Sequence, residues 1–197
     1  MKPQNLLAQV LSVFSQRYSM TRVELHESVL SGTEELMLAG KIDLGITPCS
    51  IDSTLGGSLM NIEFVAVARP DHLLHRIDHL LTPDDLQLHR QIVVRDSAHT
   101  LSMNVGWLGA EERWTASNLM TSVTWVVQGL GYAWLPLSVI EPFLKNGSLK
   151  ALNMRVGAQR SMSFRLYHVD VDGAGPATLY LAELLRRGCC DTALQHL

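Results

Sequence analysis

The stretch Gln128-Gly129-Leu130-Gly131-Tyr132-Ala133-Trp134-Leu135-Pro136 decides the fold of this chain. Apolar side chains at helical spacing predict an amphipathic helix that ends within it: Leu119, Met120, Val123, Val126, Val127 and Leu130. Gly129 and Gly131 are suited to end that helix, because glycine takes the left-handed conformation that a helix stop requires. We expect a strand at 132–135 next, and then a helix with Pro136 in its first position. Helix, strand and helix in close succession are typical of an α/β protein.

The N-terminal part of the chain alternates in the same way. Apolar spacing predicts a helix over 3–18, and alternating side chains predict a strand at 23–26. Residues 31–33 supply capping side chains for a short helix that ends at Gly40. A buried strand is predicted at 42–46. Such alternation favours a sheet of parallel strands that is covered by helices.

The rest of the chain adds strands and short helices. A loop rich in Gly and Ser is predicted at 51–61, and an irregular segment at 96–109. Further strands are predicted at 63–68, 91–94, 149–154 and 164–169. Further helices are predicted at 83–86, 136–145 and 176–187, the last ending at Gly188.

Composition excludes several classes of partner. The formal net charge is −3 and no run of Lys or Arg occurs, so this segment lacks the basic cluster that neutralises DNA phosphates. No apolar stretch is long enough to span a bilayer. The start, Met1-Lys2-Pro3-Gln4-Asn5, is too short and too polar for a secretory signal. We therefore expect a cytoplasmic protein with no membrane partner.

Several short sequence motifs occur in an order that resembles a known protein family. They are Leu6-Leu7 with Phe14 and Tyr18, Val23-Glu24-Leu25, Leu38-Ala39-Gly40-Lys41-Ile42-Asp43-Leu44-Gly45-Ile46, Ala68-Arg69-Pro70-Asp71-His72, and the stretch 128–136. The third is similar to the pattern LxxGxxDLxI and the last to xGxGxxxLP, both typical of LysR-type transcriptional regulators. These motifs occur in the same order across nearly the whole chain, which therefore resembles the C-terminal effector-binding domain of that family.

The resemblance implies an α/β fold like that of the type-2 periplasmic binding proteins. Two Rossmann-like lobes are joined by two hinge strands in that fold, and a ligand binds in the cleft between the lobes. One effector-binding lobe would hold 1–68 and 165–197, and the other 69–164. The family's winged helix-turn-helix, linker helix and first strand have no counterpart here, so we expect a chain that starts after that strand.

Polar residues at helix starts are the candidate ligand-binding residues. In the implied architecture helix N-termini point into the cleft, where free N–H groups and the helix dipole favour an anion. The candidate effector-binding residues are Ser31, Thr33, Thr47, Thr115, Ser117, Asn118 and Met120. The alternative role of the polar residues is plain helix capping. For Met120 and for Trp107 the alternative is core packing, which we favour.

Metal and redox chemistry have weaker support in the sequence. His72, His75 and His79 would share one face of a helix, but their loose spacing favours surface histidines over a metal site. The cysteines are odd in number and two of them are adjacent, which favours reduced thiols over a disulfide framework: Cys49, Cys189 and Cys190. We therefore predict no metal and no redox role.

Catalytic motifs are also missing from the sequence. The patterns GxSxG and HExxH, a glycine-rich phosphate loop and paired Cys/His do not occur. We predict that the chain is not an enzyme and needs no cofactor. The resemblance implies a regulatory domain that binds a small-molecule effector, forms a dimer or tetramer with copies of itself, and acts on DNA through a domain absent here. The polar candidate residues favour a small polar or anionic effector. A solute-binding protein of the same fold, used in transport, is the alternative.

Overall fold

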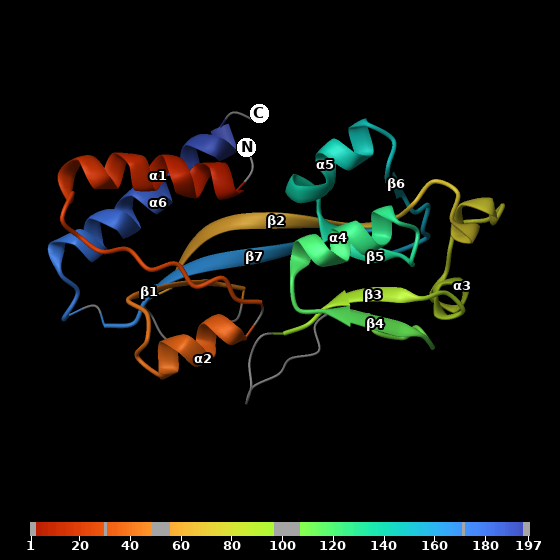
Figure 1. Cartoon of the computed structure of the whole chain (residues 1–197), viewed down its shortest axis with the longest axis horizontal. Helices are drawn as coiled ribbons and strands as arrows, with labels where there is room; N and C mark the ends of the chain where they lie inside the picture. The colour runs from red at the N-terminus through yellow and green to blue at the C-terminus, as the bar shows by residue number, and fades with distance from the viewer. Residues whose placement is uncertain (1–2, 30, 49–55, 97–106, 171, 195–197) are drawn as a thin grey trace. The chain divides into compact units, whose positions relative to one another are not determined.

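The computed structural model describes residues 3–29, 31–48, 56–96, 107–170 and 172–194, with side chains from Leu6 to Cys189 within those ranges. The chain divides into two compact units. Unit 1 takes its described residues from the chain up to Asn61 and from Ser163 onward, and unit 2 from Ile62–Asp96 and Met103–Met162. Figure 1 traces the elements of both units. The lobe boundaries that the resemblance implies, near residues 68 and 164, stay a prediction.

Hydrogen bonding joins five strands in one mixed α/β fold. The strand order is β1-β7-β2-β5, and β6 also pairs with β2. These strands are β1 (Leu44–Thr47), β2 (Gly57–Ala68), β5 (Ala133–Pro136), β6 (Lys150–Ala151) and β7 (Gln159–His168). The pairings of β1 with β7, and of β2 with β5 and β6, are antiparallel. The α/β class is as predicted, but the parallel pairing expected for the strand at 42–46 is wrong, because its partner β7 runs in the opposite direction.

In unit 1 the first helix packs on the last helix. In Figure 1, α1 (Pro3–Arg17) lies along α6 (Pro176–Leu194). Leu6 and Val10 of α1 are buried in one apolar cluster with Leu185 of α6. The sequence predicts an end of α6 at Gly188, but the helix continues past it; a Cβ at Gly188 would lie 2.6 Å from Leu6 Cδ1 of α1. The missing side chain lets the two helices approach closely.

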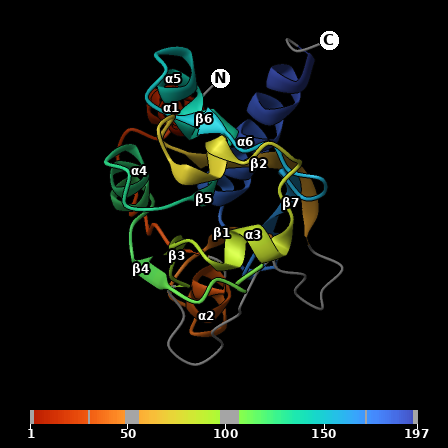
Figure 2. The same cartoon turned by 90° about the vertical axis from the view of Figure 1, so that its right-hand side faces the viewer.

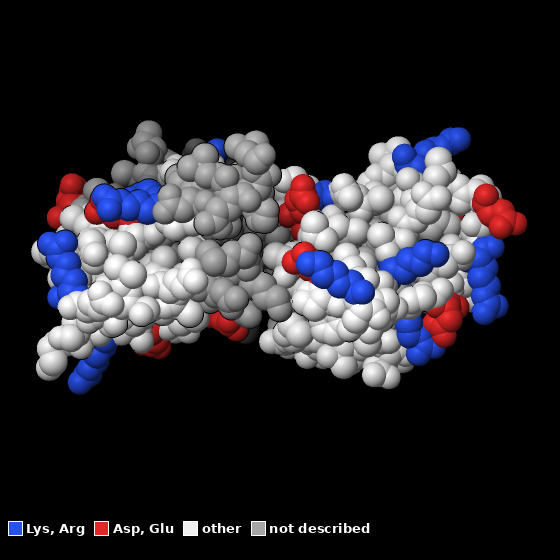
Figure 3. Space-filling view, turned by 90° about the horizontal axis from the view of Figure 1, so that it is seen from above, with Lys and Arg blue, Asp and Glu red and all other residues white. Residues whose placement is uncertain are grey.

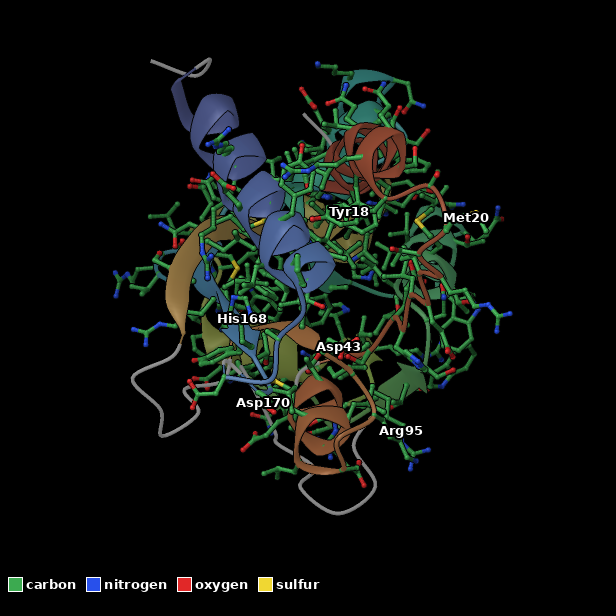
Figure 4. All side chains as sticks on the ribbon, turned by 90° about the vertical axis from the view of Figure 1, so that its left-hand side faces the viewer. Tyr18, Met20, Asp43, Arg95, His168 and Asp170 are labelled. Atoms are coloured by element: carbon green, nitrogen blue, oxygen red, sulfur yellow. The ribbon has the colours of Figure 1, made fainter. Side chains whose placement is uncertain are left out.

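Aromatic side chains continue this contact at the end of α1. The ring of Tyr18 stacks on Phe14, with centroids 5.4 Å apart, and lies 5.7 Å from the ring of Tyr180 in α6. Figure 4 shows Tyr18 in this position. The Arg17 guanidinium covers Tyr180 at 4.7 Å from the ring centroid. These contacts fix the alignment of α1 and α6.

Residues 23–26 do not form the predicted strand. The segment has no regular structure, and the side chains of Val23 and Leu25 are 49% and 60% exposed. Alternating side chains are compatible with a strand, but a strand also needs a neighbour for its backbone N–H and C=O groups. Within the described ranges no strand lies beside this segment. The prediction of a strand here is therefore wrong.

Unit 2 places an apolar cluster on each face of β2 and β5. Val65, Val67, Ala133 and Leu135 pack with α4 (Leu119–Val127) and α5 (Leu137–Lys145). Ala66, Ala68 and Tyr132 pack with side chains of η1 (Leu73–Arg76) and α3 (Pro83–Gln87), which Figure 2 views from the front. This division follows from the alternation of side chains along a strand. A separate parallel pair, β3 (Gln91–Val94) and β4 (Arg113–Ala116), adjoins α4.

The two glycines after α4 have different roles. Gly129 has a φ of +78°, so it ends the helix in the left-handed conformation as predicted. Gly131 does not have a positive φ, and its predicted role as a second helix stop is wrong. A Cβ at Gly131 would lie 2.3 Å from the carbonyl oxygen of Arg90, so the glycine permits the close approach of β3 to β5. Pro136 ends β5 and precedes α5, one position earlier than predicted.

Candidate functional site

The candidate residues of unit 1 lie at the start of α2 (Gly32–Leu38) and at the end of β1. Thr33 is 9% exposed, and its hydroxyl lies 2.6 Å from that of Ser28. Its methyl group faces β1, where a Cβ on Gly45 would lie 3.1 Å away. Thr47 is fully buried and pairs with Arg165 across the strands. Thr33 therefore helps to pack α2 on β1.

Ser31 precedes α2 but does not cap it as predicted. Its side chain makes no capping hydrogen bond, and its dihedrals are helical, with φ −76° and ψ −4°. A side-chain cap needs an extended residue, from which the hydroxyl can reach the N–H groups of the first turn. Ser31 is fully buried, and its carbonyl oxygen accepts the N–H of Glu35 at 3.1 Å. The prediction that Ser31 caps the helix is therefore wrong, although the residue lies directly before α2.

The candidate residues of unit 2 lie between the end of β4 and the first turn of α4, on either side of the buried Ala116. Thr115, Ser117 and Asn118 are exposed. Asn118 is the helix cap: its Oδ1 accepts the N–H of Met120 at 2.8 Å and that of Thr121 at 3.2 Å. The capping role predicted for Ser117 or Asn118 thus belongs to Asn118. Its side chain already satisfies two N–H groups that an anion would otherwise use.

The two apolar candidates differ in burial. The side chain of Met120 is 47% exposed, so the core packing that we favour for it from the sequence is wrong. A helix position is buried only where a neighbour covers it; Leu119 beside it packs against the unit 2 core, whereas Met120 does not. Trp107 is half-buried and packs against the cluster of Tyr132 and Leu86, which confirms its packing role.

The Asn118 cap gives a direct prediction. Asn118→Ala is expected to lower the free energy of unfolding of unit 2 by about 1 kcal/mol, because two N–H groups lose their acceptor. Asn118→Asp is expected to retain most of the stability. Urea unfolding followed by Trp fluorescence measures this, since Trp107, Trp114, Trp125 and Trp134 all lie in unit 2.

Ser117→Ala is the matched control for this variant. Ser117 is an exposed neighbour with no side-chain hydrogen bond among the described residues, so its removal is expected to change stability by less than about 0.5 kcal/mol. Equal losses in the Asn118→Ala and Ser117→Ala variants would contradict the capping role.

The histidines of unit 2 are more buried than the sequence predicts. His72 is half-buried, its Nδ1 accepts the N–H of Leu74 at 3.2 Å, and its ring lies 5.3 Å from that of His89. Burial, then the neighbouring charges of His89 and His75, lowers the pKa of His72 to about 4. Burial also lowers the pKa values of His75 and His89. The prediction of surface histidines is wrong for His72. In the part of the chain that the structure describes, no three His, Cys, Asp or Glu side chains are grouped to hold a metal.

Unit 1 contains one buried histidine of its own. His168 of β7 is 8% exposed, and its Nε2 lies 3.3 Å from the Arg186 guanidinium of α6, which donates the hydrogen bond. Figure 4 shows it between the strand and the helix. Burial and the charge of Arg186 both lower the pKa of His168, which favours the neutral ring. Cys189 is also buried in this unit, whereas the side chains of Cys49 and Cys190 lie outside the described residues.

A surface hollow of about 360 Å³ lies in unit 2 but holds none of the candidate residues. It is lined by Arg69, Pro70, Asp71, Val127, Gly147 and Ser148. Its two charged groups neutralise each other: Arg69 Nε donates to Asp71 Oδ1 at 2.6 Å, and a second nitrogen lies 2.5 Å from Oδ2. An open hollow whose charges are already paired has little to offer a ligand, so we assign it no binding role.

Two arginine–tryptophan pairs in unit 2 were missed by the sequence reasoning. Arg90 lies over Trp114, 3.9 Å from the ring centroid, and Arg160 lies over Trp134 at 4.4 Å. The partners are 24 and 26 residues apart along the sequence, so no local spacing could reveal them. Trp134 belongs to the stretch 128–136 that decides the fold.

The surface charge agrees with the composition. On the face shown in Figure 3, basic side chains are scattered among acidic ones, and no continuous basic patch is visible there. None of the helices in the described ranges is long and apolar enough to cross a membrane. The face shown in Figure 3 therefore differs from a DNA-binding face, which carries clustered basic side chains.

Comparison with known proteins decides the family. The model of the LysR substrate binding domain matches residues 3–189 of the chain. The chain belongs to this family. It is 28% identical over 152 residues to the uncharacterized HTH-type transcriptional regulator YeeY of Escherichia coli K12, covering 75% of this chain and 49% of that protein. It is also 28% identical over 141 residues to the probable HTH-type transcriptional regulator YhaJ of the same strain, covering 68% and 46%.

Solved structures confirm the fold. The regulatory domain of MetR, a LysR family regulator from N. meningitidis, matches with a TM-score of 0.70 at 17% identity, covering 93% of this chain and 87% of that one. Full-length LysG of Corynebacterium glutamicum with bound effector Arg also gives 0.70, at 14% identity, covering 94% and 64%. The periplasmic-binding-protein-like fold of LysR effector-binding domains is therefore confirmed.

The LysR family assignment also bears on the alternatives. The matching family is a domain of transcriptional regulators and not an enzyme family. The alternative of a transport protein is not favoured, because the similar proteins are regulators. The chain spans about half the length of the curated regulators that it matches.

Proposed function

We propose that this chain is the effector-binding domain of a cytoplasmic LysR-type transcriptional regulator. A small anionic metabolite binds it and changes how copies of the protein pack in a dimer or tetramer. A separate helix-turn-helix domain then engages DNA differently, because the ligand prefers one assembly over another. The family match over residues 3–189 is the observation that supports this proposal. LysG, which carries bound Arg in its structure, shares the fold.

Polar residues in both units support a small polar ligand. Ser31, Thr33 and Thr47 in unit 1 are buried hydroxyl residues. Thr115, Ser117 and Asn118 in unit 2 are exposed at a strand end and a helix start. Met120 adds an exposed apolar side chain in the same turn. We propose these seven residues as the effector-binding set.

Thermal unfolding with a panel of compounds tests the proposal. The panel holds amino acids, aliphatic carboxylates, aromatic acids and nucleotides. An effector that binds the folded chain is expected to stabilise it by about 2.7 kcal/mol at a hundredfold excess over its Kd. One chemical class is expected to act selectively. If no class stabilises the chain, the proposal of a small anionic effector is wrong.

Variants of exposed candidates locate the binding residues. Thr115→Ala and Ser117→Ala are expected to reduce the stabilisation by the active compound while the unfolding temperature without ligand stays near that of the wild type. Ser12→Ala, at an exposed position of α1, is the matched control. Undiminished stabilisation in both variants would remove Thr115 and Ser117 from the effector-binding set.

A further inference from the structure

The two arginine–tryptophan pairs of unit 2 differ in one respect. Arg90 has an anionic partner: its Nε donates to Glu112 Oε1 at 2.7 Å, and a terminal nitrogen donates to the carbonyl oxygen of Leu130 at 3.2 Å. Arg160 forms no ion pair within the described ranges, and its guanidinium lies over the ring of Trp134. The same stacking is therefore present twice, but only one guanidinium has an anionic partner.

The Arg160 guanidinium is held in place and partly removed from water. The Trp134 indole N–H donates to the carbonyl oxygen of Gly157 at 2.8 Å, and this glycine has a φ of +79°. The Arg160 nitrogens lie about 4 Å from the position of a Cβ on that glycine. Arg160 is half-buried, and burial lowers its pKa with no carboxylate opposing the shift. A partly desolvated charge is costly without an anion beside it.

Aromatic surface lies next to this cation. The ring of Trp107 is 6.0 Å from that of Trp134, tilted by 58°, and both side chains are half-buried. Tyr132 lies 5.9 Å from Trp134 and is fully buried, with its hydroxyl donated to the Leu86 carbonyl oxygen at 3.1 Å. Tyr132 thus anchors Trp134 from within the core, and the side chains of Trp134 and Trp107 are each partly exposed.

We propose that Arg160 and Trp134 form a binding site for an aromatic carboxylate. A guanidinium that lies over a ring still presents a planar fork of N–H groups, which matches the two oxygens of a carboxylate. The flat ring of the ligand packs against the exposed indole surface of Trp134 and Trp107. The site lies within one unit and does not rest on the proposed function.

Nuclear magnetic resonance of the whole chain with benzoate as the probe tests this site. The four indole N–H signals are assigned with single Trp→Phe variants. Benzoate is expected to shift the Trp134 signal saturably and to leave the Trp114 signal in place, because Arg90 above Trp114 already has Glu112. Arg160→Gln is expected to weaken benzoate binding about tenfold or more, since two charge-assisted hydrogen bonds are lost. Arg160→Lys, which keeps the charge but not the planar fork, is expected to bind with intermediate affinity.

Matched controls test separately whether benzoate binding depends on the charge, on the aromatic ring or on the folded state of the variant. Arg155→Gln removes an exposed arginine from the same part of unit 2 and is expected to bind benzoate like the wild type. An unchanged Trp114 signal shows that each variant is folded. Benzamide, which has the ring without the charge, is expected to give no saturable shift, and acetate a weaker one. An unmoved Trp134 signal, or equal binding by Arg160→Gln and wild type, overturns the site. Equal affinity for acetate and benzoate overturns its preference for an aromatic ligand.

Discussion

Gly131→Ala is expected to lower the free energy of unfolding of unit 2 by about 3 kcal/mol, a cost typical of forcing extra atoms into a closely packed site. The added Cβ would lie 2.3 Å from the carbonyl oxygen of Arg90. That oxygen is backbone and accepts the N–H of Tyr132 at 3.1 Å, so it cannot move without breaking the bridge between β3 and β5. Urea unfolding followed by Trp fluorescence measures the loss.

Gly175→Ala is the matched control for Gly131→Ala. Gly175 also has no positive φ, but a Cβ there meets nothing within 4 Å. Gly175→Ala, which lies in unit 1, is therefore expected to change the free energy of unfolding by less than about 0.5 kcal/mol; circular dichroism follows its unfolding, because all four Trp lie in unit 2. If Gly131→Ala and Gly175→Ala have the same stability, the close approach of the Arg90 carbonyl does not constrain unit 2.

Elements with strong local signals were predicted well from the sequence. The helices α1, α4 and α5 have apolar faces at helical spacing, and the structure confirms them. The strand β5 follows from a short apolar run bounded by Gly131 and Pro136. In each case the decisive residues lie within a few positions of one another, so local chemistry is sufficient.

The errors come from contacts between segments that are distant in the sequence. A glycine such as Gly188 is typical of a helix end, but here it lies inside α6, where α1 approaches closely. Val23 and Leu25 alternate like strand residues, but a strand also needs a partner. The role of Gly131 depends on the Arg90 carbonyl, 41 positions earlier. None of these partners is visible in a local pattern.

The candidate site shows the same limit. Helix-start chemistry in the sequence selects Ser117 and Asn118, and the structure assigns the cap to Asn118 through its contacts with Met120 and Thr121. Helix-start chemistry also selected Ser31 and Thr33, and the family resemblance supplied Thr47; their role in effector binding stays a prediction. The pair of Arg160 and Trp134 has no sequence signal, because cation–π contact depends on the pairing of distant strands and turns.

Histidines in unit 2 make its stability depend on pH. His72 has an ordinary pKa of 6.5 when unfolded, and about 4 in the folded unit, where burial and the nearby His89 and His75 disfavour the charged ring. Asp71 opposes this shift with its negative charge. The unfolded chain therefore binds more protons than the folded one between these two pH values, and stability falls as the pH drops from about 6.5 to about 4. The gap between the two pKa values corresponds to about 3 kcal/mol at most.

Between pH 7.5 and pH 4.5, the free energy of unfolding of unit 2 is expected to fall by about 2 to 3 kcal/mol less in His72→Asn than in the wild type. The amide oxygen of asparagine can accept the Leu74 N–H as Nδ1 does, so the cap of η1 is kept while the titrating group is lost. Urea midpoints from Trp fluorescence at the two pH values give the difference. Part of the acid loss is expected to persist, because burial also lowers the pKa values of His75 and His89.

His79→Asn is the control for His72→Asn, because it removes an imidazole that is exposed and not buried. The His79 side chain is 64% exposed, and its Nε2 lies 3.7 Å from an oxygen of Asp85. This variant is expected to keep the acid loss of the wild type. Since both variants keep the same carboxyl groups, the difference between them reports on histidine. An acid loss in His72→Asn as large as that of the wild type would show that the buried imidazole of His72 does not limit the acid stability of unit 2.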